Sequence, residues 1–286
     1  GGSTTSILVN LPGEASSVVT CLDGYQMARK GRAGAALSIS AVGSFFAGTV
    51  GTIIIVIFAE PLTRMAQKFG PADYCSLMAL GLVAAVVLAS GSVIKAIAMV
   101  FLGLLFGLVG TDVNTGAQRF TFDVPELSDG IDFAPIAMGL FGIAEIVVNL
   151  ERHLTRGGAI KVTSLWPTRE EIRRAIPAVL RGTTLGALLG VLPGGGPTLG
   201  AFSSYTLEKK ISRNPGEFGK GAVEGVAAPE AANNAAAQTS FIPMLTLGIP
   251  SNAVMALMVG AMIIQGIQPG PEVMVKKPDL FWGMIV

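Results

Sequence analysis

Charged side chains are scarce in this sequence of 286 residues. Only 14% of the residues are Asp, Glu, Lys or Arg, and 51% are hydrophobic, whereas soluble domains carry about 25% charged residues. The mean hydropathy is +0.62. The formal net charge is only +1, so no excess of positive charge indicates a nucleic-acid partner. The composition predicts a protein of the lipid bilayer that does not bind nucleic acid.

Histidine and cysteine are also nearly absent. His153 is the single histidine, and Cys21 and Cys75 are the two cysteines. They cannot supply a four-ligand Cys/His metal site or a disulfide framework. The sequence contains neither H-E-x-x-H nor a G-x-x-x-x-G-K-[ST] phosphate loop, and one histidine provides little acid-base chemistry near neutral pH. We therefore expect that the protein is not an enzyme, and that it binds no cofactor and no metal ion other than an alkali cation such as Na⁺.

Long uncharged runs predict an all-α, polytopic integral membrane protein. The clearest span is 35–59, because a helix needs about 20 apolar residues to cross the hydrocarbon core. The other predicted helices are 75–90 and 93–109, which form a tight hairpin, and 131–150, 171–192, 197–210, 229–247 and 252–267. The sequence lacks an initial Met and ends as another apolar segment begins, so we expect an internal fragment of a longer subunit.

Three segments combine Gly or Pro with Ser, Thr or Asn in apolar surroundings: 1–20, 182–205 and 228–258. Non-helical backbone at membrane depth is tolerated only where it is buried in protein or lines a wet cavity. Broken helices also present free N–H groups to carboxylates and free carbonyls to Na⁺. Small residues can serve close helix packing instead, but three such clusters favour a binding site.

The first and third of these segments resemble each other. Setting Pro12 against Pro250 aligns 8–19 with 246–257. Paired breaks in two halves indicate a transporter site between structural repeats. The prediction is an inverted-repeat secondary transporter with broken or re-entrant helices. Its expected parts are 1–150, with the end of the first repeat and the following spans, a cytoplasmic connection 151–174, and a second repeat 175–286.

Four stretches resemble the large membrane subunit of the bacterial tripartite tricarboxylate transporters. They are GGSTTSILVNLPGEASSVVTCLDGYQMARKGRAG (1–34), GTDVNTGAQRFTF (110–122), RGTTLGALLGVLPGGGPTLGAFSSY (181–205) and PEAANNAAAQTSFIPMLTLGIP (229–250). The resemblance implies a multi-pass permease of the bacterial inner membrane. Such a permease takes a di- or tricarboxylate, such as citrate, from a periplasmic solute-binding protein, and works beside a small membrane subunit.

The same resemblance implies symport driven by an ion gradient, and we expect Na⁺ as the coupling ion. Two alternatives stay open at this point: an ion-conducting channel, because glycine-lined carbonyls also build selectivity filters, and another secondary transporter of small anions.

Hydroxyl, amide and backbone groups of the broken segments are the expected ligands. The predicted substrate-binding residues are Ser3, Thr4, Thr5, Asn10, Pro12, Gly13, Gly194, Gly195, Gly196, Asn233, Asn234, Gln238 and Thr239. The predicted ion-binding residues are Glu14, Gly248, Pro250, Ser251 and Asn252. For Glu14 the alternative is a helix N-terminal cap.

Two further expectations concern the region around the glycine run. Arg181 is expected to extend to the cytoplasmic surface, as long cationic side chains do near helix ends; the alternative is a pair with a carboxylate substrate or with Glu145. A side chain at Gly195 is expected to impair transport, because it restricts a backbone that needs conformational freedom. A side chain at Gly190, in the preceding helix, is expected to be mild.

Loop charges predict the orientation, because cytoplasmic loops carry the excess of Lys and Arg. The loop 24–34 and the connection 151–174 are rich in these residues, and the loop 111–130 is acidic. Cysteine introduced by Arg156→Cys should therefore be labelled by a membrane-impermeant thiol reagent from the cytoplasm only. Cysteine introduced by Ser128→Cys should be labelled from the periplasm only, and the reverse pattern would overturn the orientation.

Overall fold

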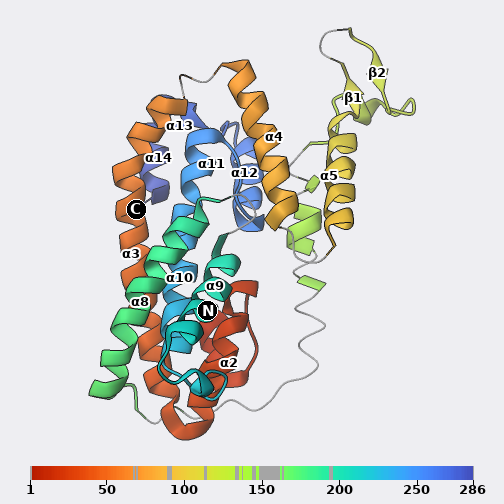
Figure 1. Cartoon of the computed structure of the whole chain (residues 1–286). Coiled ribbons are helices and arrows are strands. Elements are labelled where there is room, and N and C mark those ends of the chain that lie inside the picture. Colours follow the sequence, from red (N-terminus) through yellow and green to blue (C-terminus); the bar gives the residue numbers. More distant parts are fainter. Residues whose placement is uncertain are drawn as a thin grey trace.

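The structure, a computed structural model, describes most of the chain. The described residues are 2–66, 68, 70–88, 92–112, 115–132, 135, 136, 138–143, 146, 147, 162, 164–192 and 196–285. They are almost entirely helical, with one two-stranded hairpin. Figure 1 shows the main helices side by side in a bundle. The expected all-α fold is confirmed.

The N-terminal part contains a break and then a long helix. Helix α1 (Gly2–Val9) ends before the non-helical residues 10–14, and η1 (Ala15–Ser17), α2 (Val18–Met27), η2 (Ala28–Arg32) and α3 (Ala33–Ala66) follow. Gly31 has φ +77°, which only glycine adopts readily, and it bends the chain between α2 and α3. The span predicted at 35–59 lies within α3, which continues beyond it through Pro61.

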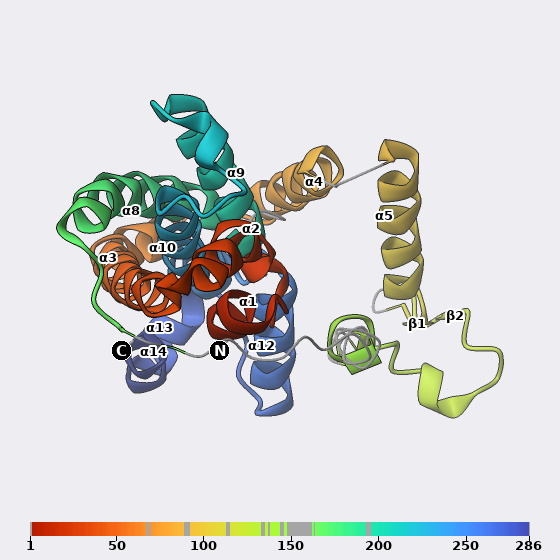
Figure 2. The same cartoon turned by 90° about the horizontal axis from the view of Figure 1, so that it is seen from below.

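The next elements lie to one side of the bundle. Helices α4 (Pro71–Leu88) and α5 (Val93–Gly107) agree with the predicted pair 75–90 and 93–109. Strands β1 (Gly110–Thr111) and β2 (Gln118–Arg119) form an antiparallel hairpin, followed by η3 (Pro125–Leu127). Figure 2 shows α5 and this hairpin apart from the bundle.

Only part of the predicted span 131–150 is described, and it includes the π-helical turn η4 (Met138–Ile143). Glu145 and Arg156 lie outside the described residues, as does most of the connection up to residue 163.

The C-terminal part supplies the remaining helices of the bundle. They are α8 (Arg169–Gly190), α9 (Gly196–Ile211), η6 (Pro215–Glu217), α10 (Glu224–Thr239), α11 (Phe241–Leu247), α12 (Ala253–Ile264), α13 (Pro271–Lys276) and α14 (Pro278–Ile285). A capping box at Thr168 starts α8, because its hydroxyl accepts from the backbone N–H of Glu171. The predicted helix 229–247 is divided at Ser240 into α10 and α11, and Gly248 ends α11 in the left-handed conformation.

Helix α10 forms the centre of the bundle. It packs against α3, α8, α9 and α2, and 12 of its 16 residues are buried. By contrast, α5 has no buried residue, and α3 exposes Phe45 and Val42 to 78% and 69%. Within the described residues, the helical stretch Ala15–Met65 is long and apolar enough to cross a membrane, and α5 and α12 are shorter apolar helices. Apolar outer faces around a central helix of small and polar residues are typical of a membrane protein.

The contact between α8 and α10 is made without intervening side chains. Gly182, Gly186 and Gly190 recur every fourth residue on α8, and each faces the main chain of α10. A Cβ on Gly186 would lie 2.1 Å from the carbonyl oxygen of Ala232. Small residues at such spacing allow helix backbones to approach closely.

The expectation that Gly190 tolerates a side chain is therefore wrong. A Cβ there would lie 2.2 Å from Oγ1 of Thr239 and 2.4 Å from the carbonyl oxygen of Ala236. The prediction that Gly190 lies inside a helix is correct. The space beside it, however, is filled by α10, which lies about 50 residues further along the chain.

We expect Gly190→Ala to destabilise the protein by about 1–3 kcal/mol, because overpacking forces the two backbones apart. The matched control is Gly48→Ala in α3, where nothing lies within 4 Å of the added Cβ. That change should be neutral or stabilise by up to about 1 kcal/mol, since Ala has the higher helix propensity. Thermal unfolding in detergent measures both, and equal melting temperatures would contradict the close contact.

Candidate functional site

The most enclosed polar cluster surrounds Glu230 on α10. Its side chain is fully buried. Ser3 of α1 and Ser40 of α3 donate hydrogen bonds to Oε2, with oxygen–oxygen distances of 2.6 Å and 3.2 Å. Thr20 of α2 donates to Oε1. Three hydroxyls from three helices thus converge on one carboxylate of a fourth helix.

Ser3 is one of the predicted substrate-binding residues, whereas Glu230 is not among the predicted residues. One signal was available, because Glu230 is an acidic residue in the otherwise uncharged stretch from Gly225 to Thr246. An ionisable residue in such an apolar stretch is a functional candidate by default.

The amides that follow Glu230 on α10 extend the polar region by one turn. Asn234 Nδ2 donates to Ser44 Oγ of α3 at 2.8 Å, to the carbonyl of Glu230 at 2.8 Å and to Asn233 Oδ1 at 2.5 Å. Asn233 is 5% exposed. Both predicted asparagines therefore lie in a regular helix beside the cluster rather than in the break itself.

The other predicted residues of the first segment lie around the break at 10–14. Thr4, Thr5 and Asn10 are exposed, and Thr5 donates to the carbonyl of Gly2 at 3.0 Å. Asn10 has φ +56°. Pro12 is half-buried, and Gly13 packs against Gly2, because its added Cβ would lie 2.7 Å from the Gly2 Cα.

Glu14 follows directly after this break. It occupies the N-cap position of η1, in a capping box with Ser17. Glu14 therefore occupies a helix N-terminal cap position, as the alternative prediction stated. Its role in ion binding stays a prediction.

The second and third breaks meet at the other end of α10. Helix α8 ends at Gly190 and α9 begins at Gly196, whose added Cβ would lie 3.0 Å from Asn252. Asn252 caps α12 by accepting from the backbone N–H of Met255, and it donates to Ser240 Oγ at 3.1 Å. Gly194 and Gly195 lie outside the described residues.

Hydroxyls bind this end of α10 to its neighbours. Ser240 donates to the carbonyl of Gly190 at 3.1 Å, and Ser251 is buried at 3.5 Å from the carbonyl of Ser240. Thr239 donates to the carbonyl of Ala235 within α10.

The other predicted residues of this region lie close by. Gln238 lies against α3 at Gly51, and Gly248 and Pro250 are half-buried in the break itself.

The predicted residues thus form two groups rather than one. The first surrounds Glu230, and the second surrounds Ser240 and Asn252. About 14 Å separates Glu230 from Thr239 along α10, at 1.5 Å per residue. One helix therefore connects both groups.

The breaks at Pro12 and Pro250 share a backbone geometry. Asn10 and Gly248, each two residues before the proline, have φ +56° and +74°. The backbone N–H of Leu11 donates to the carbonyl of Thr5, and that of Ile249 to the carbonyl of Pro243, both at 3.2 Å and both six residues back. The alignment of the two segments therefore has a structural counterpart at the helix ends, and the wider inverted repeat stays a prediction.

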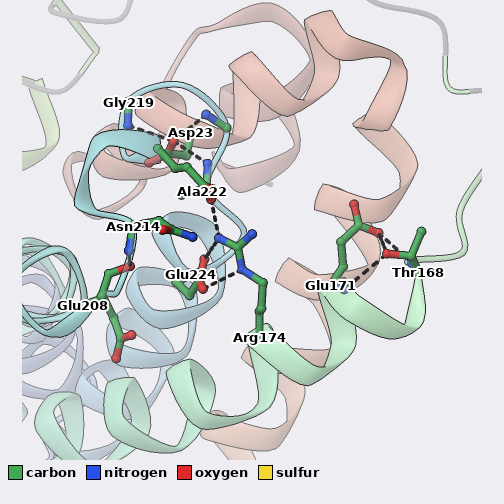
Figure 3. A network of polar contacts seen from close by, with 12 residues as sticks. Asp23, Thr168, Glu171, Arg174, Glu208, Asn214, Gly219, Ala222 and Glu224 are labelled. Atoms are coloured by element: carbon green, nitrogen blue, oxygen red, sulfur yellow. Dashed lines mark hydrogen bonds and ion pairs between the residues drawn. The ribbon is translucent and has the colours of Figure 1, made fainter.

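The other buried carboxylates have structural partners. Asp23 Oδ1 accepts from the backbone N–H groups of Gly219, Gly221 and Ala222 at 2.7–2.9 Å, and Figure 3 shows it held against this loop. Tyr205 donates to Asp23 Oδ2 at 2.9 Å. These bonds attach α2 to the loop before α10.

The side chain of Arg181 is 42% exposed and pairs with a buried glutamate. Its Nε and Nη2 donate to Glu208 of α9 at 2.6 Å and 2.8 Å, and Glu208 is 2% exposed. The pair supplies the counter-charge that a buried carboxylate needs, and the expected extension of Arg181 to the cytoplasmic surface stays a prediction. About two turns earlier on α8, Arg174 pairs with Glu224 of α10, as Figure 3 shows. Arg174 also pairs with Glu217 of η6.

No group of three or more His, Cys, Asp or Glu side chains that could hold a metal ion occurs among the described residues. An apolar pocket of about 750 Å³ lies elsewhere, between α3 and α8, and Trp166 and Val42 help to line it. The chemistry available near α10 is therefore that of hydroxyl, amide and carboxylate oxygens, which suit hard cations and anionic substrates rather than transition metals.

Comparison with known proteins gives a match over the whole chain. The family described as "Tripartite tricarboxylate transporter TctA family" matches residues 1–286. The Agrobacterium vitis protein named "Uncharacterized 52.8 kDa protein in TAR-I ttuC' 3'region" is 59% identical over 286 residues, which is 100% of this chain and 57% of that protein. A second Agrobacterium vitis protein, "Uncharacterized protein in TAR-II ttuC' 3'region", is 69% identical over 100 residues, 35% of this chain and 41% of that protein.

The chain thus spans little more than half the length of the first of these relatives. No solved structure matches it.

Proposed function

Because the chain belongs to the tripartite tricarboxylate transporter TctA family, we propose that it forms part of a permease subunit for di- or tricarboxylates such as citrate. The family match over residues 1–286 is the observation that carries this proposal. The subunit works in the bacterial inner membrane as a multi-pass protein. It receives its substrate from a periplasmic solute-binding protein and has a small membrane subunit as partner.

The arrangement of polar and apolar surfaces supports a transporter. Helices α3 and α5 expose large apolar side chains, which suit lipid. The polar residues of α10 face inward, where Glu230 and Asn234 meet hydroxyls of neighbouring helices and Asn233 is buried beside Asn234. Polar groups in a membrane interior are costly, and they mark substrate and ion pathways.

The breaks supply the groups that a carboxylate needs. The exposed residues Thr4 and Thr5 lie within α1, Asn10 follows directly after its end, and Asn252 lies at the start of α12. Helix ends carry unpaired N–H or C=O groups, which bind carboxylates and cations respectively. We assign the substrate to these breaks and to the amides of α10, and the energy source to a Na⁺ gradient.

A binding-protein-dependent symporter and a channel differ in measurable ways. We expect proteoliposomes that contain the subunit and its small partner to accumulate citrate only when the binding protein and an inward Na⁺ gradient are present. Uptake should saturate with substrate concentration. Ion conductance without saturable carboxylate uptake would favour the channel instead.

Asn233 provides the sharpest single test of the substrate site. We expect Asn233→Ala to lower carboxylate uptake about tenfold or more, on the order of 1.4 kcal/mol, with a melting temperature close to wild type. The matched control is Thr184→Ala on the exposed face of α8, whose hydroxyl bonds only to the carbonyl of Leu180 in the described structure. A parallel loss of uptake and folded protein in Asn233→Ala would indicate a packing role.

A further inference from the structure

The three fully or nearly fully buried carboxylates of the described residues are satisfied in different ways. Asp23 accepts backbone N–H groups, and Glu208 has the guanidinium of Arg181. Glu230 has neither, since its partners are the hydroxyls of Ser3, Thr20 and Ser40. This difference in donor type separates Glu230 chemically from the other two.

A hydroxyl group can act either as a hydrogen-bond donor or as an oxygen ligand, whereas a backbone N–H group can only donate. Each hydroxyl carries one donor and two lone pairs, so it can donate to a carboxylate or offer its oxygen to a cation. The hydroxyls around Glu230 can therefore turn into ligands while the carboxylate stays in place. The three N–H groups on Asp23 Oδ1 have no lone pair to offer, and Tyr205 supplies the single hydroxyl of that site.

The cluster also lacks a positive charge. Among the described residues, no Lys or Arg side chain forms an ion pair with Glu230. An ionised carboxylate that is removed from water without a counter-charge costs free energy, and a bound cation removes that cost. A single negative charge matches a monovalent cation.

The ligand atoms indicate which cation fits. Two carboxylate oxygens and three hydroxyl oxygens converge, with spacings of 2.6 Å and 3.2 Å for the two serines. Hard oxygen ligands without sulfur or imidazole select hard cations, and close spacing favours a small one. We propose that Glu230, Ser3, Thr20 and Ser40 form a Na⁺ site, whose coupling role rests on the transport function proposed above.

Binding of Na⁺ here would act on the first break. Ser3 belongs to α1, which ends at Val9 directly before the break, and η1 after the break packs against α9 and α10. A cation that ligates Ser3 and Glu230 together holds α1 against α10. It thereby fixes the position of the exposed groups Thr4, Thr5 and Asn10 that we assign to the substrate.

The test measures thermal unfolding of the purified subunit without substrate or binding protein. NaCl is titrated against choline chloride at constant ionic strength, with KCl in a parallel series. We expect a saturable rise in melting temperature with Na⁺ only, because a ligand that binds the folded state stabilises it. Glu230→Gln should abolish the rise or increase the half-maximal Na⁺ concentration at least tenfold.

Hydroxyl variants separate ligation from packing. Thr20→Val and Ser40→Ala should each increase the half-maximal Na⁺ concentration several-fold. The matched control is Thr183→Val, because Thr183 Oγ1 is buried with no hydrogen-bond partner in the described part of the chain. It should leave the Na⁺ response unchanged. If Glu230→Gln does not fold, the shift of Thr20→Val and Ser40→Ala relative to Thr183→Val still decides the matter.

Three results would overturn the site: a wild-type Na⁺ response in Glu230→Gln, an equal response to KCl, or hydroxyl variants that behave like Thr183→Val. Failure of the transport proposal is distinguishable from these. Na⁺ stabilisation that depends on Glu230 without any carboxylate uptake would overturn the function and retain the site. Na⁺-driven uptake that persists in Glu230→Gln would overturn the site and retain the function.

Discussion

The close approach of α8 and α10 determines how the rest of the bundle is arranged. Because Gly182, Gly186 and Gly190 place no side chain between the helices, α10 lies directly on the backbone of α8. Its other faces then contact α3, α9 and α2. Every buried polar group of this central helix must consequently find its partner on a neighbouring helix or within α10 itself, since an unpaired polar group in an apolar interior costs several kcal/mol.

That requirement explains where the polar residues of α10 are directed. Glu230 meets α1, α2 and α3, Asn234 meets Ser44 of α3, and Ser240, just after its end, meets Gly190 of α8. Buried polar groups that are satisfied in this way specify one arrangement of the helices, because any other arrangement leaves them unpaired. The same contacts that hold the bundle together therefore build the candidate site.

Local physics made the helices and the breaks predictable from the sequence. Apolar runs located α4, α5 and α12 to within about four residues, whereas α3 continues seven residues beyond the predicted 35–59. Gly and Pro located the ends of α1, α8 and α11. The cluster around Glu230 depends instead on partners 190 to 227 residues away in the chain. A lone serine or threonine in an apolar run gives no sign of which distant carboxylate it will meet. For the same reason the predicted residues could not be divided into two groups before the position of α10 was known.

The two groups are joined by a single rigid element, and this has a mechanical consequence. The first break reaches α10 through Ser3 at Glu230, and the third reaches it through Asn252 at Ser240. Both breaks leave their helix through a residue of positive φ and the same hydrogen bond six residues back. A close-packed helix moves as a unit, because protein interiors are densely packed and have few voids that could absorb a local shift. A displacement of α10 would therefore alter the contacts at both breaks, and its backbone contacts with Gly182, Gly186 and Gly190 would carry α8 with it.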